Sequence, residues 1–219
     1  MGGIPFKDFD FWAYLSAGFL FLFTLDYILG TALFAKEQWT VVQVVIAGSA
    51  AYVVGNLASS ISTILFERLL VGRFLGAPRQ VLFGVVTAPK LMRVLMPGYF
   101  EALPPNTRDK VLEKGKALGV TGVGEELFWP AYDAAKNNSV AMGRMQTFMH
   151  QYVFFRNMAL VALINAAMLV GSYQWLSGPK ANLWWAAGAL FTGIGLLFRY
   201  LKYFRHFAVE VFTSFAYSK

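Results

Sequence analysis

Four long apolar runs divide the chain, and more polar sequence separates them. They cover residues 11–29, 41–66, 158–176 and 183–198. At about 1.5 Å per residue, a helix made by such a run is comparable in length with the ~30 Å hydrocarbon layer of a membrane. The pattern therefore predicts an all-α integral membrane protein with four transmembrane helices, and a helical domain between the second and third of them.

Residues 139–176 contain no proline and change character partway along. They are basic and aromatic as far as Arg156 and Asn157, and apolar from Met158 onward. One helix can run through the whole stretch. We therefore predict a single helix that begins in the middle domain and crosses the membrane, with Arg156 and Asn157 at the membrane surface.

Proline and glycine divide the middle domain, residues 67–157, into candidate helices. One helix is expected to begin at Glu125 or Glu126, because acidic side chains are favoured at a helix N-terminus. In the stretch 73–100, glycine and proline repeatedly interrupt the apolar residues. Three arrangements stay open for it: a juxtamembrane elbow, a re-entrant piece and part of a small core. The signals for an earlier helix are Pro104 and Pro105 at its start, Asn106 or Thr107 as its cap and Gly119 at its end.

The last two apolar runs are joined only by residues 177–182, so they are predicted to form an antiparallel hairpin. The tail that follows places Arg199, Lys202, Arg205 and His206 on roughly one side of a helix, as in a basic amphipathic anchor on the membrane surface. The predicted organisation is an N-terminal arm and hairpin (1–66), the middle domain (67–157), a second hairpin (158–198) and the tail (199–219).

Composition and charge support membrane insertion and give an orientation. Hydrophobic residues make up 57% of the chain and charged residues only 14%, and the absence of cysteine excludes disulfides and thiolate chemistry. Of the 19 Lys and Arg, only Lys36 and Lys180 fall in the two short connections. Because cytoplasmic segments are enriched in Lys and Arg, both termini and the middle domain are predicted to be cytoplasmic. Anionic lipid at that face then explains the net charge of +7, and nucleic acid is not expected as a partner.

Two of the apolar runs carry small residues at helical spacing. Such seams let membrane helices approach closely, within one chain or between copies of it. They predict helix packing and favour a homo-oligomer. The residues concerned are Gly48, Gly55 and Ser59 in the second run, and Gly188 and Gly195 in the fourth.

Three further polar residues lie inside the runs. Asp26 is close to the end of the first run, where an acid more often faces headgroups or pairs with a neighbour such as Lys36 than forms a functional site. Asn56 and Asn165 lie at similar depths and need partners, because lipid offers none. We predict that the two amides bond each other, bond across a subunit seam or line a wet pore. The alternative is that each bonds a nearby backbone carbonyl.

Signals of catalysis are few. The chain has no glycine-rich phosphate loop and no zinc-binding helix, so no cofactor or metal is expected. The spacing of Arg144 and His150 is similar to the Arg-x(4 to 6)-His signature of the HEPN ribonucleases, which implies an arginine that stabilises phosphate charge and a histidine that handles the proton. Glu125 or Glu126 would be the third group of such a catalytic site, beside Arg144 and His150. For His150, a structural role, in which the histidine caps a helix, stacks on a ring or contacts lipid, is favoured over this catalytic role.

The segment YVFFRNMALVALI, together with FDFWAYLSAGFLFLFTLDYILG and AYVVGNLASSIS, resembles a group of small multi-span prokaryotic membrane proteins. Those proteins have a Tyr-x-Phe-x-Arg-Asn stretch before a late span, and Phe155 stands where other members prefer a small residue. Proteins of similar build act as membrane effectors beside antiviral modules, so the resemblance implies an inner-membrane effector. The matching positions here are Tyr152, Phe154, Arg156 and Asn157.

We therefore expect an oligomeric inner-membrane effector or pore that is controlled through its cytoplasmic domain. One alternative is a membrane-surface enzyme that uses Arg144 and His150. The other is a scaffold that holds a cytoplasmic partner protein at the membrane. The expected partners are anionic lipid, further copies of the chain and a cytoplasmic protein.

Overall fold

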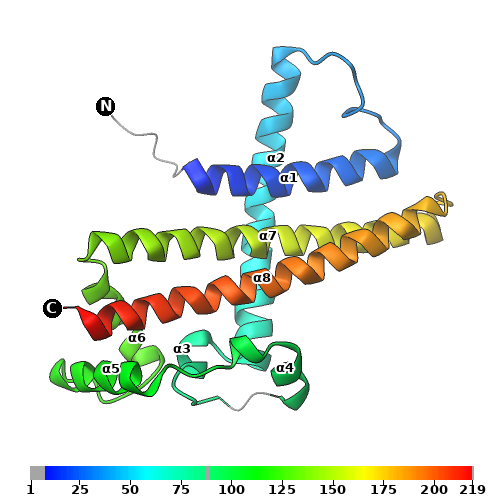
Figure 1. Ribbon diagram of the computed structural model, residues 1–219. Helices are drawn as coiled ribbons and strands as arrows, with labels where there is room; N and C mark the ends of the chain where they lie inside the picture. The colour runs from blue at the N-terminus through cyan, green and yellow to red at the C-terminus, as the bar shows by residue number, and fades with distance from the viewer. Residues whose placement is uncertain (1–7, 87–88, 219) are drawn as a thin grey trace. The chain divides into compact units, whose positions relative to one another are not determined.

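The computed structural model describes residues 8–86 and 89–218, in which helices are the only regular secondary structure (Figure 1). Within these described residues, four helices are long and apolar enough to cross a membrane, as the sequence predicts. Most of the predicted N-terminal arm lies outside the described residues. The elements are α1 (Asp8–Leu29), α2 (Val41–Ser62), the π-helix η1 (Thr63–Leu75), α3 (Pro78–Val81), α4 (Lys90–Leu95), the 3-10 helix η2 (Pro97–Tyr99), α5 (Pro105–Ala117), α6 (Glu125–Ala135), α7 (Ser139–Trp175) and α8 (Ala181–Tyr217).

The long helix predicted over residues 139–176 is present as α7, which ends at Trp175. No proline interrupts its hydrogen-bond ladder. The predicted start of α6 is also confirmed, since this helix begins at Glu125. α5 ends shortly before Gly119, whose φ of 77° is the left-handed conformation that glycine adopts readily after a helix C-terminus.

The start of α5 differs from the prediction. Its N-cap is Pro104, and no side chain makes a capping hydrogen bond. Pro105 takes the first helical position, where the missing N–H would have had no helical partner in any case. Asn106 and Thr107 therefore fall inside the first turn, and the prediction that one of them caps the helix is wrong.

The second apolar run belongs to a longer helix than predicted. α2 begins with a capping box between Thr40 and Gln43, and it passes into η1. The π-helix ends at Leu75, and the N–H of the next residue, Gly76, donates to the Val71 carbonyl five residues earlier at 2.7 Å. Gly76 has a φ of 82°, a conformation that favours glycine and ends the helix here.

Two compact units divide the chain. Unit 1 comprises residues 1–65 and 153–199, and unit 2 comprises residues 66–152 and 200–219. Both α7 and α8 contribute to both units. The tail predicted as a separate surface anchor is instead the continuation of α8, and from residue 200 it belongs to unit 2.

In unit 1, α1 crosses α2 with the two backbones in contact (Figure 1). A methyl group on Gly18 would overlap the carbonyl oxygen of Ala51, and one on Gly55 would overlap that of Tyr14. α7 and α8 also approach closely, because a Cβ on Gly193 would lie 2.9 Å from Leu163 Cδ2. Glycine at these positions removes the side chain that would otherwise hold the helices apart.

Unit 2 has its own hydrophobic core, to which the end of α8 contributes. The ring of Phe212 makes edge-to-face contacts with Phe83, at 5.0 Å between centroids, and with Phe128, at 5.8 Å. Burial of this apolar face, rather than contact with lipid, accounts for the apolar side of the predicted anchor. The buried residues from α8 are Ala208, Val211, Phe212, Phe215 and Ala216.

Residues 73–100 belong partly to this core. Leu82 and Phe83 are buried in it, which corresponds to the third of the three arrangements left open by the sequence. Tyr99 is buried as well, and its hydroxyl donates to the Gly76 carbonyl at 2.8 Å. Burial raises the pKa of the Tyr99 phenol, so this hydroxyl remains a donor at physiological pH.

The C-terminal end of α8 is held by a lysine from α5. Lys114 Nζ donates to the carbonyl of Phe215 at 3.1 Å and also to the carbonyl and hydroxyl of Ser218. Carbonyls in the last turn of a helix lack the full set of helical donors, and a cation complements the partial negative charge at a helix C-terminus. This contact fixes the end of α8 within unit 2.

Candidate functional site

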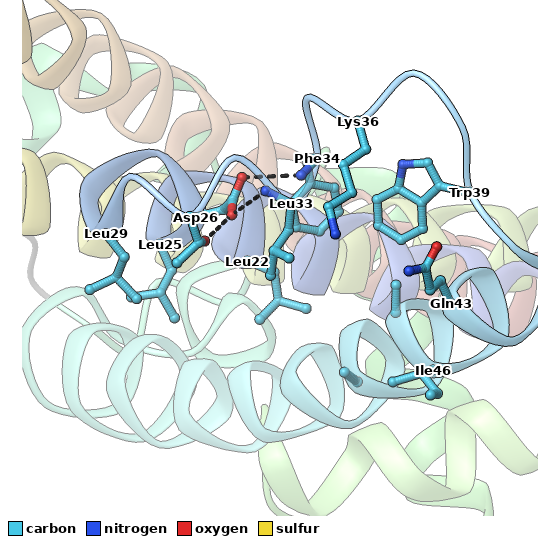
Figure 2. Close-up of a pocket in the computed structure, with 13 residues that line it drawn as sticks. Leu22, Leu25, Asp26, Leu29, Leu33, Phe34, Lys36, Trp39, Gln43 and Ile46 are labelled. Carbon is cyan, nitrogen blue, oxygen red and sulfur yellow. Dashed lines mark hydrogen bonds between the residues drawn. The ribbon is translucent and has the colours of Figure 1, made fainter.

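Asp26, in the last turn of α1, organises the connection to α2 (Figure 2). Its carboxylate accepts hydrogen bonds from the Thr31 hydroxyl and from the backbone N–H groups of Leu33, at 2.9 Å, and Phe34, at 3.2 Å. No ion pair with the exposed Lys36 is formed among the described residues. Because its oxygens are occupied by groups of the loop, Asp26 stabilises this connection rather than presenting a free acid.

A cavity of about 360 Å³ lies beside this connection. Figure 2 shows Leu22 and Leu25 of α1 on one side, and Trp39 and Gln43 on another. Apart from a few polar groups at Asp26 and its neighbours, the walls are apolar. The cavity can therefore hold a hydrocarbon group. The Asp26 carboxylate on its wall already accepts hydrogen bonds from the loop.

The helices of unit 1 are also tied together near the two short connections. The Tyr27 hydroxyl of α1 donates to Asn182 Oδ1 of α8 at 2.9 Å, and Asn182 Nδ2 donates to Ser172 Oγ of α7 at 3.0 Å. Asn182 is 2% exposed, so this chain is a buried polar link among three helices. Sequence reasoning missed it, because Tyr27 is 155 residues away from Asn182 in the chain and the three residues form no local pattern.

A second buried polar cluster joins α7 to α2, and it contains the predicted Arg-Asn pair. Arg156 is 6% exposed and Asn157 is fully buried. Arg156 Nη2 donates to Ser59 Oγ at 3.1 Å, and Arg156 Nε donates to Asn157 Oδ1 at 3.3 Å. Ser62 Oγ donates to the same Asn157 oxygen at 2.8 Å. The pair thus contributes to helix packing inside unit 1, and its position relative to a membrane surface stays a prediction.

The two predicted intramembrane amides are not hydrogen-bonded to each other in this chain. Asn165 Nδ2 donates to the backbone carbonyl of Leu20 in α1 at 3.2 Å. Asn56 is exposed on α2. The prediction that they share a hydrogen bond within one subunit is therefore wrong. Asn165 bonds a backbone carbonyl, as in the alternative, and a partner for Asn56 across a subunit seam or in a wet pore stays a prediction.

Some of the predicted small residues contact another helix in this chain, and others have free space beside them. Gly55 and Ser59 lie in buried contacts of α2, with α1 and α7 respectively. A Cβ at Gly48, Gly188 or Gly195 would meet no atom within 4 Å. Those three glycines are therefore not packing positions within the chain, and their packing role between copies stays a prediction.

The candidate catalytic residues lie in unit 2. Arg144 Nε makes an ion pair with Glu210 Oε1 of α8 at 2.8 Å, and Glu210 also accepts a hydrogen bond from Ser214. His150 is half-buried on the same helix as Arg144. Glu125 pairs with Arg79. These contacts give Arg144 and Glu125 partners within the fold, and the convergence of Arg144, His150 and Glu125 or Glu126 on one substrate stays a hypothesis.

The aromatic positions of the predicted Tyr-x-Phe-x-Arg-Asn stretch pack against other rings. Tyr152 lies 5.1 Å from Phe204 and 6.0 Å from Phe207 between ring centroids, in unit 2. In unit 1, Phe154 contacts Phe155 edge to face, and the guanidinium of Arg199 lies 5.5 Å from the Phe155 centroid. Comparison with protein-family models, curated proteins and solved structures finds no match to this chain.

Proposed function

We propose that this protein is an oligomeric inner-membrane effector or pore, controlled through unit 2 on the cytoplasmic side. A role in antiviral defence follows from the resemblance described above. The proposal rests chiefly on one observation, the exposed polar face of α2, which is part of a helix long and apolar enough to span a membrane.

The polar residues of this face are Ser49, Asn56 and Ser60, which are all exposed, and the exposed Val45 and Val53 lie on the same side. The spacing of the polar residues, seven and four, places them on one side of the helix. The Asn56 amide has no hydrogen-bond partner among the described residues, and lipid offers none. A lone amide in hydrocarbon costs several kcal/mol, so a second subunit or a column of water is the favourable neighbour for this face.

Control through unit 2 is supported by the helices that both units share. α7 and α8 are each unbroken over 37 residues and contribute to both units. A partner that shifts either helix in unit 2 therefore acts on the same helix in unit 1. The binding partner is expected to be a cytoplasmic protein or a further copy of the chain.

The cysteine-free chain allows a direct test of the polar face. Ser60→Cys is expected to form an intersubunit disulfide on mild oxidation in membranes, or to make ion flux through reconstituted protein sensitive to a charged thiol reagent. The matched control is Ile61→Cys. Ile61 is also exposed, but it points about 100° away around the helix. If Ser60→Cys gave neither a cross-link nor a block of flux, the face would be in contact with lipid and the proposal would fail.

The predicted orientation can be tested in the same way. Cysteines at Lys36 and Lys180, both exposed in the short connections, should react in intact cells with a reagent that does not cross membranes. A cysteine at the exposed Lys116 of α5 should react only after the cells are opened. Labelling at Lys116 in intact cells would reverse the proposed orientation.

The enzyme alternative makes a different prediction. If Arg144 and His150 form a nuclease site, Arg144→Ala and His150→Ala abolish RNA cleavage and leave assembly intact. We expect instead that the wild-type protein cleaves no RNA, and that Arg144→Ala changes stability by at most about 1 kcal/mol, as for other partly exposed ion pairs. Glu210→Gln, which removes the same pair, should match it in thermal unfolding. Cleavage lost in Arg144→Ala but kept in Glu210→Gln would support the enzyme.

A further inference from the structure

A second cavity in unit 1 has a volume of about 610 Å³, within the range of small-molecule binding sites. It lies between α1, α7 and α8. The exposed Gly188 lines it, and a Cβ at this position would meet no atom within 4 Å. Most of the wall is hydrocarbon. Representative lining residues are Leu20, Phe23, Leu169, Trp185 and Gly188.

One polar group on this wall lacks a partner. Asn165 is 3% exposed and lines the cavity, and its Oδ1 accepts no hydrogen bond among the described residues. Its Nδ2 donates to the Leu20 carbonyl, so the reverse orientation of the amide would bring two acceptors together. The free oxygen is therefore fixed as the acceptor.

Two other polar side chains on the wall are already engaged as donors, and the third, Thr192, is exposed. Thr24 Oγ1 donates to the Leu20 carbonyl at 3.1 Å, and the Tyr27 hydroxyl donates to Asn182. A buried water usually needs two to four polar partners, whereas Asn165 Oδ1 is the one buried polar lining atom without a hydrogen bond among the described residues. Water is thus a poor occupant, and an apolar molecule that carries a single donor matches the wall better.

We infer that this cavity binds a lipid-soluble alcohol, with its hydroxyl donating to Asn165 Oδ1 and its hydrocarbon body against α1, α7 and α8. The molecule is either a free aliphatic alcohol or a membrane lipid with an unesterified hydroxyl, since both have this chemistry. The inference is independent of the proposed pore, because it uses a different face of unit 1 from Ser49, Asn56 and Ser60.

The test uses full-length protein in nanodiscs of one phosphatidylcholine and a diazirine-bearing fatty alcohol as the photoreactive probe. Labelling of peptides that line the cavity is measured with 1-dodecanol or dodecyl methyl ether as competitor. The ether has the same hydrocarbon body but no donor. Because a hydrogen bond contributes about 0.5–1.5 kcal/mol, the alcohol should compete roughly two- to thirteenfold better. Equal competition by the ether would overturn the inference.

Dioleoylglycerol, added as a third competitor, identifies the source of the alcohol. Displacement of the probe by dioleoylglycerol at a lower concentration than 1-dodecanol assigns the cavity to a membrane lipid. Displacement by 1-dodecanol alone assigns it to a free alcohol. Both results support the site, and failure of both competitors would refute it.

Two variants locate the probe within the protein. Gly188→Phe places a ring in the cavity and should abolish labelling. Gly195→Phe is the matched control, because its Cβ also meets open space on α8 but it does not line the cavity. Asn165→Leu should retain labelling but remove the preference for alcohol over ether. Thermal unfolding of each variant shows whether it is folded, and labelling that persists in folded Gly188→Phe would place the probe elsewhere.

Discussion

Gly55→Ala is expected to disrupt the packing of α1 on α2, whereas Gly48→Ala, seven residues earlier on the same helix, is expected to be tolerated. The added methyl group at Gly55 would overlap the backbone carbonyl of Tyr14. A side chain could rotate away, but this carbonyl is part of the ladder of α1, so the two helices must separate. Overpacking typically costs about 1–3 kcal/mol, and we expect a loss at or above the upper end.

Thermal unfolding of the purified protein in detergent measures the difference. A Cβ at Gly48 meets no atom, and alanine is the better helix former by about 1 kcal/mol in water, so Gly48→Ala should unfold at the parent temperature or above it. Gly18→Ala provides an independent check, because it would overlap Ala51 across the same crossing. Similar stability of Gly55→Ala and Gly48→Ala would show that α1 and α2 are not packed through these residues.

The four candidate spans and α7 were predictable because each depends on a local pattern of apolar residues and on the absence of proline. The pairing of the helices was not predictable in the same way. Gly48 and Gly55 have the same spacing signal, and only Gly55 meets another helix. Gly193, which the seam did not include, makes the close approach to α7. Spacing identifies a face, but the choice of contact depends on residues far away in sequence.

The end of α8 illustrates the same limit. Residues 199–217 have charged and apolar sides, a pattern that fits both a membrane-surface helix and a helix packed on a protein core. The structure places Phe212 against Phe83 and Phe128, residues more than 80 positions earlier. Such a partner cannot be read from the tail alone, because the amphipathic pattern records that one side is buried but not what covers it.

The polar sites also differ in how much of each could be predicted from the sequence. Asp26 was expected to face headgroups or to pair with a neighbour such as Lys36, and its carboxylate instead accepts hydrogen bonds from Thr31, Leu33 and Phe34 of the loop. The bond between Tyr27 and Asn182 had no sequence signal, because each residue alone is ordinary at a helix end. The Arg-Asn pair was predicted only to lie at the membrane surface. Of its partners, Ser59 was identified only as a small residue.

Asn157→Leu is expected to be among the most destabilising substitutions in unit 1. Asn157 Oδ1 accepts from Ser62 Oγ and from Arg156 Nε, and the side chain is fully buried. Leucine fills a similar volume but withdraws an acceptor from the guanidinium of Arg156. An unsatisfied buried neutral group costs about 1–3 kcal/mol, and a charged one more. The matched control is Asn165→Leu on the same helix, which removes one bond to a backbone carbonyl and should cost about 0.6 kcal/mol.

A double-mutant cycle assigns the cost to the buried charge. If the loss in Asn157→Leu comes from the guanidinium, adding Arg156→Met should recover part of it, because both members of the polar contact are then replaced by apolar groups. Thermal unfolding of the two single variants and the double variant should therefore be strongly non-additive. Strict additivity, or equal losses in Asn157→Leu and Asn165→Leu, would mean that Asn157 acts through packing alone. The non-additive outcome would assign to Asn157 the role of an acceptor that allows an arginine to be buried between α2 and α7.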